Sequence, residues 1–202
     1  ITDGTMTVKQ LKCYGKTTEE EIGKAMTSQL SIQPTQNATS RALIKYFGTG
    51  TIYSVVQNIE FSSDRKYTAT SFKEYGTFVI GANEYIKAKI SKEIEEDIKL
   101  SAKQGYRVLA VAHSKNQISD DKLPKDLEVV AIILIEDTIR KDAEKTIKWF
   151  KENGVEIKII SGDDPQTVSN IAGRVGVEGS EKFINLEGVS LEEVKKLAKQ
   201  YT

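Results

Sequence analysis

The sequence predicts a mixed fold in two parts: a mostly antiparallel α+β part flanked by helices, then an α/β part. Two stretches rich in β-branched and aromatic residues, Ile52–Phe61 and Tyr67–Tyr75, lie on either side of a polar turn, which is typical of an antiparallel pair. After Glu136 strands and helices alternate, which indicates parallel crossover units and a doubly wound sheet. We therefore place the boundary near Glu136.

The composition narrows the class of protein. Acidic and basic residues both number 29 among 202, so no net charge attracts nucleic acid or an anionic membrane. Cys13 is the one cysteine and His113 the one histidine, which leaves no disulfide framework and little basis for a zinc site or a Ser-His-Asp triad. The longest strongly apolar run, Val129–Ile135, is far too short to cross a bilayer.

The first part is expected to hold three helices and six strands. The run Thr17–Glu21 offers two overlapping capping boxes for the start of the first helix, and Asn37 or Thr39 caps the second. Gly105 ends the third helix. The first predicted helix carries Ile22, Ala25, Met26 and Leu30 on one face, and the other two cover Ala38–Phe47 and Lys92–Gln104. The predicted strands cover Val8–Tyr14, Ile52–Phe61, Tyr67–Tyr75, Thr77–Ile80, Tyr106–His113 and Leu127–Ile135. The last strand is apolar throughout, so we expect it inside the sheet.

The second part is expected to contain three helices and two further strands. The helices are predicted at Ile139–Asn153, Pro165–Val175 and Leu191–Gln200, and the strands at Val155–Ile160 and Phe183–Leu186. Pro165 suits the first turn of its helix because its missing N–H is not needed there. Trp149 shares the first of these helices with Ile147 and Phe150, and core packing is the interpretation that we favour for it.

One strand of the second part ends in residues suited to phosphate. Ser161, Gly162 and Asp163 follow the predicted strand, and a helix opens at Pro165. Ligands bind at the carboxyl ends of parallel strands, and a helix N-terminus offers free N–H groups to a phosphoryl group. The alternative is a plain strand-to-helix turn with Asp163 or Asp164 as the helix cap.

The same region resembles the P-type ATPases. Ser161–Val168, with Ile171-Ala172 and Gly176-Val177 after it, is similar to their TGDxxxTAxxIAxxxGI segment. Asp137–Arg140 resembles their DPxR motif, with Thr138 in place of proline. Ile1–Thr7 resembles the stretch that ends and follows their DKTGT motif, so the nucleophilic aspartate is expected just before residue 1. The resemblance implies a haloacid-dehalogenase-type, Rossmann-like phosphorylation domain in which Ser161, Gly162 and Asp163 contact the phosphoryl group.

A second resemblance lies in the first part. Glu60–Lys66 is similar to the F-S-x-x-R-K stretch in the nucleotide domain of the non-heavy-metal classes. It implies that Phe61 stacks on adenine and that Lys66 approaches the nucleotide beside Glu60. An aromatic face and a lysine charge are physically suited to these roles. The alternative is a hairpin turn with a core phenylalanine and solvated charges.

Three weaker matches complete the pattern. Val79–Glu84 resembles the KGAxE motif, which implies that Gly81 and Ala82 approach adenine, although Ile80 replaces the lysine. Gly105–Ala112 resembles G-x-R-V-L-A-x-A and makes Arg107 a phosphate contact. Ser40 stands where the family has a glutamate that helps to position adenine. The motif resemblances also add Asp137 and Arg140 to the expected nucleotide-binding residues.

The resemblance as a whole implies the ATP-binding part of a bacterial, non-heavy-metal P-type cation-transporting ATPase at the cytoplasmic face of the cell membrane. Residues 1–8 would be a hinge segment, 9–135 the nucleotide-binding domain and 136–202 part of the phosphorylation domain. ATP and Mg²⁺ are the implied cofactors, with the metal ligands mostly outside this chain. The implied partners are the actuator domain and transmembrane helices of the same pump, with no nucleic acid, and the fragment is expected to be monomeric. Alone it should bind ATP weakly and form no aspartyl-phosphate.

Two other classes of protein remain open from the residues. A soluble phosphatase of the haloacid-dehalogenase type with a large cap would share the α/β part, but it should carry an N-terminal D-x-D-x-T, which is not seen. A non-catalytic nucleotide-binding module would bind ATP equally well. A dinucleotide-binding domain is disfavoured because no G-x-G-x-x-G follows a predicted strand.

Overall fold

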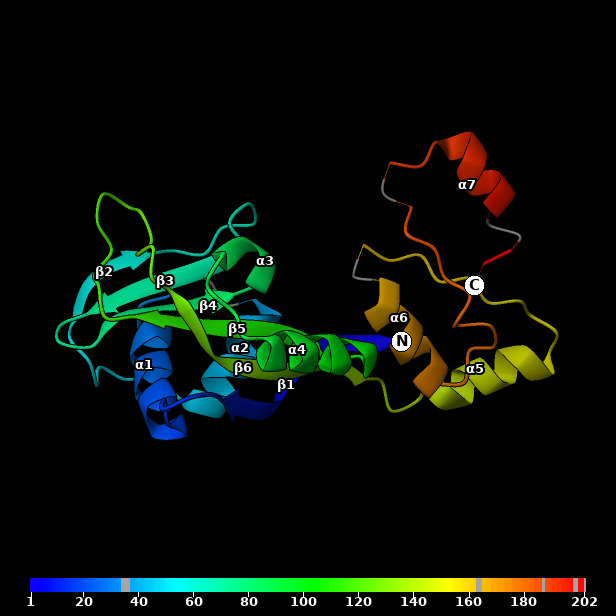
Figure 1. Ribbon diagram of the computed structural model, residues 1–202. Coiled ribbons are helices and arrows are strands. Elements are labelled where there is room, and N and C mark those ends of the chain that lie inside the picture. Colours follow the sequence, from blue (N-terminus) through cyan, green and yellow to red (C-terminus); the bar gives the residue numbers. More distant parts are fainter. Residues whose placement is uncertain (34–36, 163–164, 187, 198–199, 202) are drawn as a thin grey trace.

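The computed structural model describes residues 1–33, 37–162, 165–186, 188–197 and 200–201. Within these ranges one six-stranded sheet carries the first part of the chain, and helices α5, α6 and α7 gather beyond one end of strands β1 and β6 (Figure 1). The predicted antiparallel sheet flanked by helices is therefore confirmed.

The strands pair in the order β1-β6-β5-β4-β3-β2, and every pairing in the sheet is antiparallel. Their bounds are β1 (Thr2–Cys13), β2 (Val55–Ile59), β3 (Tyr67–Phe72), β4 (Gly76–Gly81), β5 (Arg107–Ser114) and β6 (Glu128–Ile139). Strand β6 lies between β1 and β5, as its continuous apolar sequence predicted.

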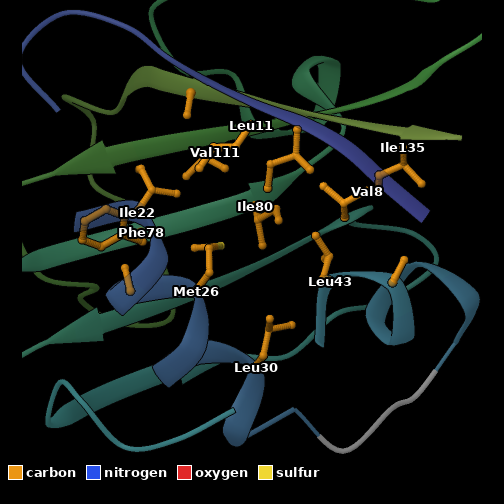
Figure 2. Packing of buried hydrophobic residues seen from close by; sticks show 14 of the residues in the cluster. Val8, Leu11, Ile22, Met26, Leu30, Leu43, Phe78, Ile80, Val111 and Ile135 are labelled. Carbon is orange, nitrogen blue, oxygen red and sulfur yellow. The ribbon is translucent and has the colours of Figure 1, made fainter. Parts of the chain in front are cut away.

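Helices cover both faces of this sheet. Helices α1 (Glu19–Ser31) and α2 (Ala38–Phe47) pack on one face, and α3 (Asn83–Ile86) and α4 (Lys92–Lys103) pack on the other. Because successive side chains of a strand point to opposite faces, Phe78 and Ile80 lie under α1 and α2 while Val79 lies under α3 and α4. Figure 2 shows the first of these two cores.

The helix starts follow the predicted caps. The Thr18 hydroxyl accepts a hydrogen bond from Glu21 N, and the Glu21 carboxylate accepts one from Thr18 N, so the capping box is complete. Asn37 caps α2 by accepting from Ser40 N at 2.8 Å. Helix α3 was not predicted, because four residues are too few to show a 3.6-residue period.

Strands β1 and β6 are longer than predicted and form a two-stranded ribbon that leads out of the sheet. Thr2 pairs with Ile139 and Met6 with Asp137, so the predicted hinge residues 1–8 lie largely within a strand. The ribbon is irregular, with register shifts between Thr2 and Met6 and between Val8 and Gln10. The division of the chain into domains stays a prediction.

The two strands predicted in the second part are wrong. Its helices are present as α5 (Ala143–Glu152), α6 (Pro165–Arg174) and α7 (Leu191–Leu197), but Val155–Ile160 and Phe183–Leu186 form no strand. A strand exists only where a neighbouring backbone accepts and donates its hydrogen bonds, and no ladder pairs either segment within the described residues. Ile160, the last residue of the first of these segments, is 93% exposed. The described residues therefore contain no parallel sheet.

The prediction that Trp149 packs in the core is also wrong. Its side chain is 57% exposed and meets Phe150 edge-on, with ring centroids 5.5 Å apart. Helix α5 instead buries Ala143 and Ile147. Residues two apart on a helix face different directions, so Trp149 cannot share the buried side of Ile147.

Polar contacts join the second part to the sheet. Glu136 of β6 binds Lys9 of β1, with Nζ 2.9 Å from Oε2, and Arg174 of α6, with Nη1 2.6 Å from Oε1. Asn170 of α6 donates from Nδ2 to the carbonyl oxygen of Lys103 at 2.8 Å. These contacts hold α6 against the end of α4 and against the β1–β6 ribbon.

We expect acid to weaken the Glu136 contacts. Partial burial disfavours the Glu136 carboxylate, but hydrogen bonds from Lys9 and Arg174 outweigh it and hold its pKa below the ordinary value. The stabilisation is therefore present above the unfolded pKa and is lost as pH falls through the lower, folded pKa. At pH 7, Glu136→Gln should lower the free energy of unfolding by about 1 kcal/mol, since both cationic partners are half exposed.

The measurement is thermal unfolding of the wild type and Glu136→Gln from pH 7 downward. The difference in Tm should shrink as the wild-type carboxylate becomes protonated, whereas Glu181→Gln, at an exposed glutamate, should show no such trend. A difference that stays constant at all pH values would contradict the assignment.

Candidate functional site

A cavity of about 250 Å³ lies between helices α1 and α2 and the ends of strands β3 and β4. Its volume is close to the lower end of the range for small-molecule sites, roughly 300–1,000 Å³. The wall is formed by Met26, Gln29, Leu30, Gln33, Asn37, Thr39, Ser40, Leu43, Phe61, Lys66, Thr68, Ile80, Gly81, Ala82 and Leu109. Four predicted nucleotide-binding residues, Phe61, Lys66, Gly81 and Ala82, are therefore together at one cavity.

Part of the wall is apolar. Ile80 of β4 points toward the helices, where Met26, Leu30 and Leu43 surround it (Figure 2). This is the face of β4 that alternation assigns to α1 and α2. A lysine at position 80 would put a charge among these side chains, so isoleucine gives the cavity an apolar surface that suits a flat aromatic group.

A tight turn before β3 places Phe61 and Lys66 at the cavity. Lys66 N donates to the carbonyl oxygen of Ser62 at 2.9 Å, and Arg65 N donates to the Ser62 hydroxyl at 3.1 Å. Phe61 is 40% exposed, so the alternative of a core phenylalanine is wrong. A half-exposed aromatic ring beside a lysine is available to a ligand.

The end of β4 passes close to the same turn. Ala82 N donates to the carbonyl oxygen of Lys66 at 3.1 Å, which fixes Gly81 and Ala82 against Lys66. A Cβ atom on Gly81 would lie 2.4 Å from that oxygen, so this approach requires glycine. The resemblance implies that the Gly81 backbone approaches adenine. In the structure, Gly81 lies close to the backbone of Lys66.

The remaining predicted nucleotide-binding residues do not line the cavity. Glu60 is exposed, and its carbonyl oxygen accepts from Arg65 Nη2 at 2.9 Å. Arg107 of β5 donates from Nε to Asp137 Oδ2 of β6 at 2.8 Å, and Asp137 is buried. Arg140 donates from Nε to the carbonyl oxygen of Thr2 at 3.0 Å. Their contact with a nucleotide stays a prediction.

The phosphoryl end of the predicted site is described only in part. Ser161 lines a second, mostly apolar cavity of about 160 Å³ beside the start of α6. Gly162 is open, since an added Cβ would meet nothing within 4 Å. Asp163 lies outside the described residues, as does Asp164. Helix α6 begins at Pro165 as predicted.

Comparison with known proteins identifies the family. A sequence profile of the haloacid dehalogenase-like hydrolases matches residues 2–201. The chain belongs to the haloacid dehalogenase-like hydrolases.

The curated relatives that the chain resembles include cation-transporting ATPases. It is 32% identical over 206 residues to the probable cation-transporting ATPase exp7 of Streptococcus pneumoniae, covering 99% of this chain and 26% of that protein. It is 30% identical over 179 residues to the calcium-transporting ATPase CtpE of Mycolicibacterium smegmatis, covering 89% of this chain and 22% of that protein. The resemblance to P-type cation-transporting ATPases is therefore confirmed. The chain spans about a quarter of the length of these relatives.

Solved structures show the same fold. A crystal structure of a zinc-transporting PIB-type ATPase matches with a TM-score of 0.61 at 19% identity, over 88% of this chain and 26% of that chain. A second crystal structure of a zinc-transporting ATPase of this type, in another state, matches with a TM-score of 0.60. At this identity the likeness concerns the fold alone, and it confirms the predicted mixed fold with an antiparallel sheet flanked by helices.

The family implies magnesium, which requires a suitable set of oxygen ligands. Mg²⁺ prefers oxygen ligands in octahedral geometry, with carboxylates as the usual protein contribution. No group of three or more His, Cys, Asp or Glu side chains comes together in the described ranges. The described residues therefore do not provide a Mg²⁺ site built from protein side chains alone.

Within the described part of the chain, no helix is both long and apolar enough to span a bilayer.

Several wall residues were not predicted from the sequence, and Gln29 is the most informative. Met26 and Leu30 belong to the apolar face expected for the first helix. Gln29 is also buried, about one turn after Met26 and directly before Leu30. A glutamine on the buried side of an amphipathic helix is the signal that could have identified it, because such a side chain normally needs a partner.

Proposed function

We propose that this chain is the ATP-binding part of a P-type cation-transporting ATPase and that adenine occupies the cavity between α1, α2 and β4. One observation carries the proposal: Phe61, Lys66, Gly81 and Ala82, which the resemblance named from two separate segments, line the same cavity. Three of them also contact one another through the backbone of the turn and the end of β4.

The chemistry of the wall supports an adenine nucleotide. The apolar side chains around Ile80 remove a flat ring from water, and Phe61 offers a face on which the base stacks. Lys66, at the same turn, attracts phosphate as a point charge. The base would therefore lie inward and the phosphates near Lys66.

The other predicted residues are assigned to later steps in the intact pump. We place Arg107, Asp137 and Arg140 at the phosphate end of the nucleotide, and Ser161, Gly162 and Asp163 at the phosphoryl group after transfer. The acceptor would be an aspartate outside this chain, and an aspartyl-phosphate would couple ATP hydrolysis to cation movement. The actuator domain and membrane helices of the same pump would be the partners, at the cytoplasmic face of the membrane.

Calorimetric titration with ATP tests the cavity. Phe61→Ala should weaken binding about tenfold, because stacking of a base on an aromatic ring is worth roughly 1–3 kcal/mol. Lys66→Ala should weaken binding by a smaller factor that decreases with salt, because its contribution is electrostatic. Phe183→Ala is the matched control, since Phe183 is 37% exposed and lines the second cavity, beside the start of α6. Equal affinities for the wild type and Phe61→Ala would sink the proposal.

A further inference from the structure

Gln29 of α1 stands out in the wall of the cavity. Gln29 is only 1% exposed, and neither its side-chain nitrogen nor its side-chain oxygen has a hydrogen-bond partner in the described part of the chain. The other such buried atom there is Oδ1 of Asn83, one residue beyond the cavity-lining Ala82. The unpartnered buried side-chain polar atoms of the described residues therefore lie at or next to this cavity.

Neighbouring polar side chains of the wall are already engaged. Gln33 donates from Nε2 to the Thr68 hydroxyl at 2.8 Å, and Thr68 donates to the carbonyl oxygen of Ile59 at 2.9 Å. The Ser40 hydroxyl donates to the carbonyl oxygen of Asn37 at 3.0 Å. Gln29 differs from these residues because its whole amide is buried without a partner.

A buried amide in this state is unfavourable for the unliganded protein. Burying a polar group without a hydrogen bond lowers stability, whereas an apolar group of similar shape at the same position is neutral or stabilising. A methionine at position 29 would suit the surrounding Met26 and Leu30 better. The amide is explained if a ligand supplies the missing partners.

We propose that Gln29 recognises the edge of the purine base and makes the cavity selective for adenine; this rests on the proposed function above. The amide oxygen accepts a hydrogen bond from the 6-amino group, and the amide nitrogen donates to an adjacent ring nitrogen. In an apolar wall such a pair discriminates strongly, because a base without the matching group leaves the amide unpaired.

The test compares ATP with purine riboside triphosphate, which lacks the 6-amino group, on the wild type and on Gln29→Met. The wild type should bind ATP about tenfold more tightly than the analogue, as expected for one hydrogen bond to a buried group. In Gln29→Met the ATP affinity should fall about tenfold and the ratio between the two nucleotides should approach one. The Tm of unliganded Gln29→Met should equal or exceed the wild-type value, a result that a structural hydrogen-bonding role would not give.

Two controls separate the possible failures. Gln57→Met removes a glutamine amide that binds Asp121 away from the cavity, and it should retain the wild-type preference for ATP. If Phe61→Ala weakens ATP binding but Gln29→Met keeps the tenfold ratio, the role of Gln29 is overturned and the proposed function stands. If the wild type binds no ATP, both are overturned.

A measurement on the wild type alone covers the case in which Gln29→Met does not fold. The side-chain NH₂ signals of Gln29 can be assigned by triple-resonance NMR and followed during titration with ATP and with the analogue. They should shift strongly with ATP and much less with purine riboside triphosphate. Equal shifts with both nucleotides would overturn the proposal.

Discussion

Replacing Gly81 with alanine is expected to destabilise the protein by about 3 kcal/mol and to remove most of its ATP affinity. A Cβ at this position would lie 2.4 Å from the carbonyl oxygen of Lys66, 2.5 Å from Cβ of Tyr67 and 2.6 Å from Cα of Tyr67. Two of these three atoms belong to the backbone, so no side-chain rotation relieves the overlap.

The cost extends to the ligand site because relief requires the strands to separate. Gly81 pairs with Tyr67 across β3 and β4, and Lys66 immediately precedes Tyr67. Moving this turn away from β4 displaces Lys66 and, through the same turn, Phe61. One added methyl group therefore changes both the sheet and the two side chains proposed to hold the nucleotide.

Gly23→Ala is the matched control for this substitution. Gly23 lies within α1, and a Cβ there would meet nothing within 4 Å. Alanine is the better helix former, so this variant should gain about 0.5–1 kcal/mol. Urea unfolding gives the stabilities, and calorimetry gives the ATP affinities. A Gly81→Ala protein as stable as the wild type would show that the close approach of β3 and β4 is not required.

The antiparallel part of the fold could be predicted because its signals are local. Ile52–Phe61 and Tyr67–Tyr75 are rich in β-branched and aromatic residues, and caps such as Thr18 and Asn37 mark the helix starts. The wrong strands, Val155–Ile160 and Phe183–Leu186, are also rich in apolar residues. What they lack is a neighbouring backbone, and local sequence does not record whether a ladder partner is present.

The candidate site was predictable to a similar degree. Phe61, Lys66, Gly81 and Ala82 were named because short motifs carry them, and the structure brings them together. Gln29 carries no motif, and its importance depends on whether its amide finds a partner in three dimensions. The pairing of Arg107 with Asp137 likewise follows from the register of β5 and β6 and from no pattern along the chain.

Replacing Arg107 with methionine is expected to destabilise the protein by about 3 kcal/mol. The guanidinium donates to Asp137 at 2.8 Å, and the Asp137 side chain is only 7% exposed. Methionine keeps the length of the side chain but leaves a buried carboxylate without this cation. The loss should fall at the lower end of the range for a broken buried pair, because the Arg107 side chain is one-third exposed.

Replacing both partners distinguishes the loss of the ion pair from the cost of burying an unpaired carboxylate. Arg107→Met with Asp137→Val removes the stranded carboxylate, so the double variant should recover much of the stability that Arg107→Met loses. Urea unfolding of the wild type, both single variants and the double variant completes the cycle. A double variant whose loss equals the sum of the single losses would show that the two side chains do not stabilise each other.

The same variants decide how Arg107 relates to the nucleotide in this chain. Arg107 does not line the cavity that holds Phe61 and Lys66, so folded Arg107→Met should bind ATP within about twofold of the wild type. In this chain Arg107 would then act through Asp137 to fix β5 against the β1–β6 ribbon, and its proposed contact with phosphate would require the intact pump. A large fall in affinity, measured by calorimetry at a temperature where the variant is folded, would instead show that Arg107 already contacts the nucleotide in this chain.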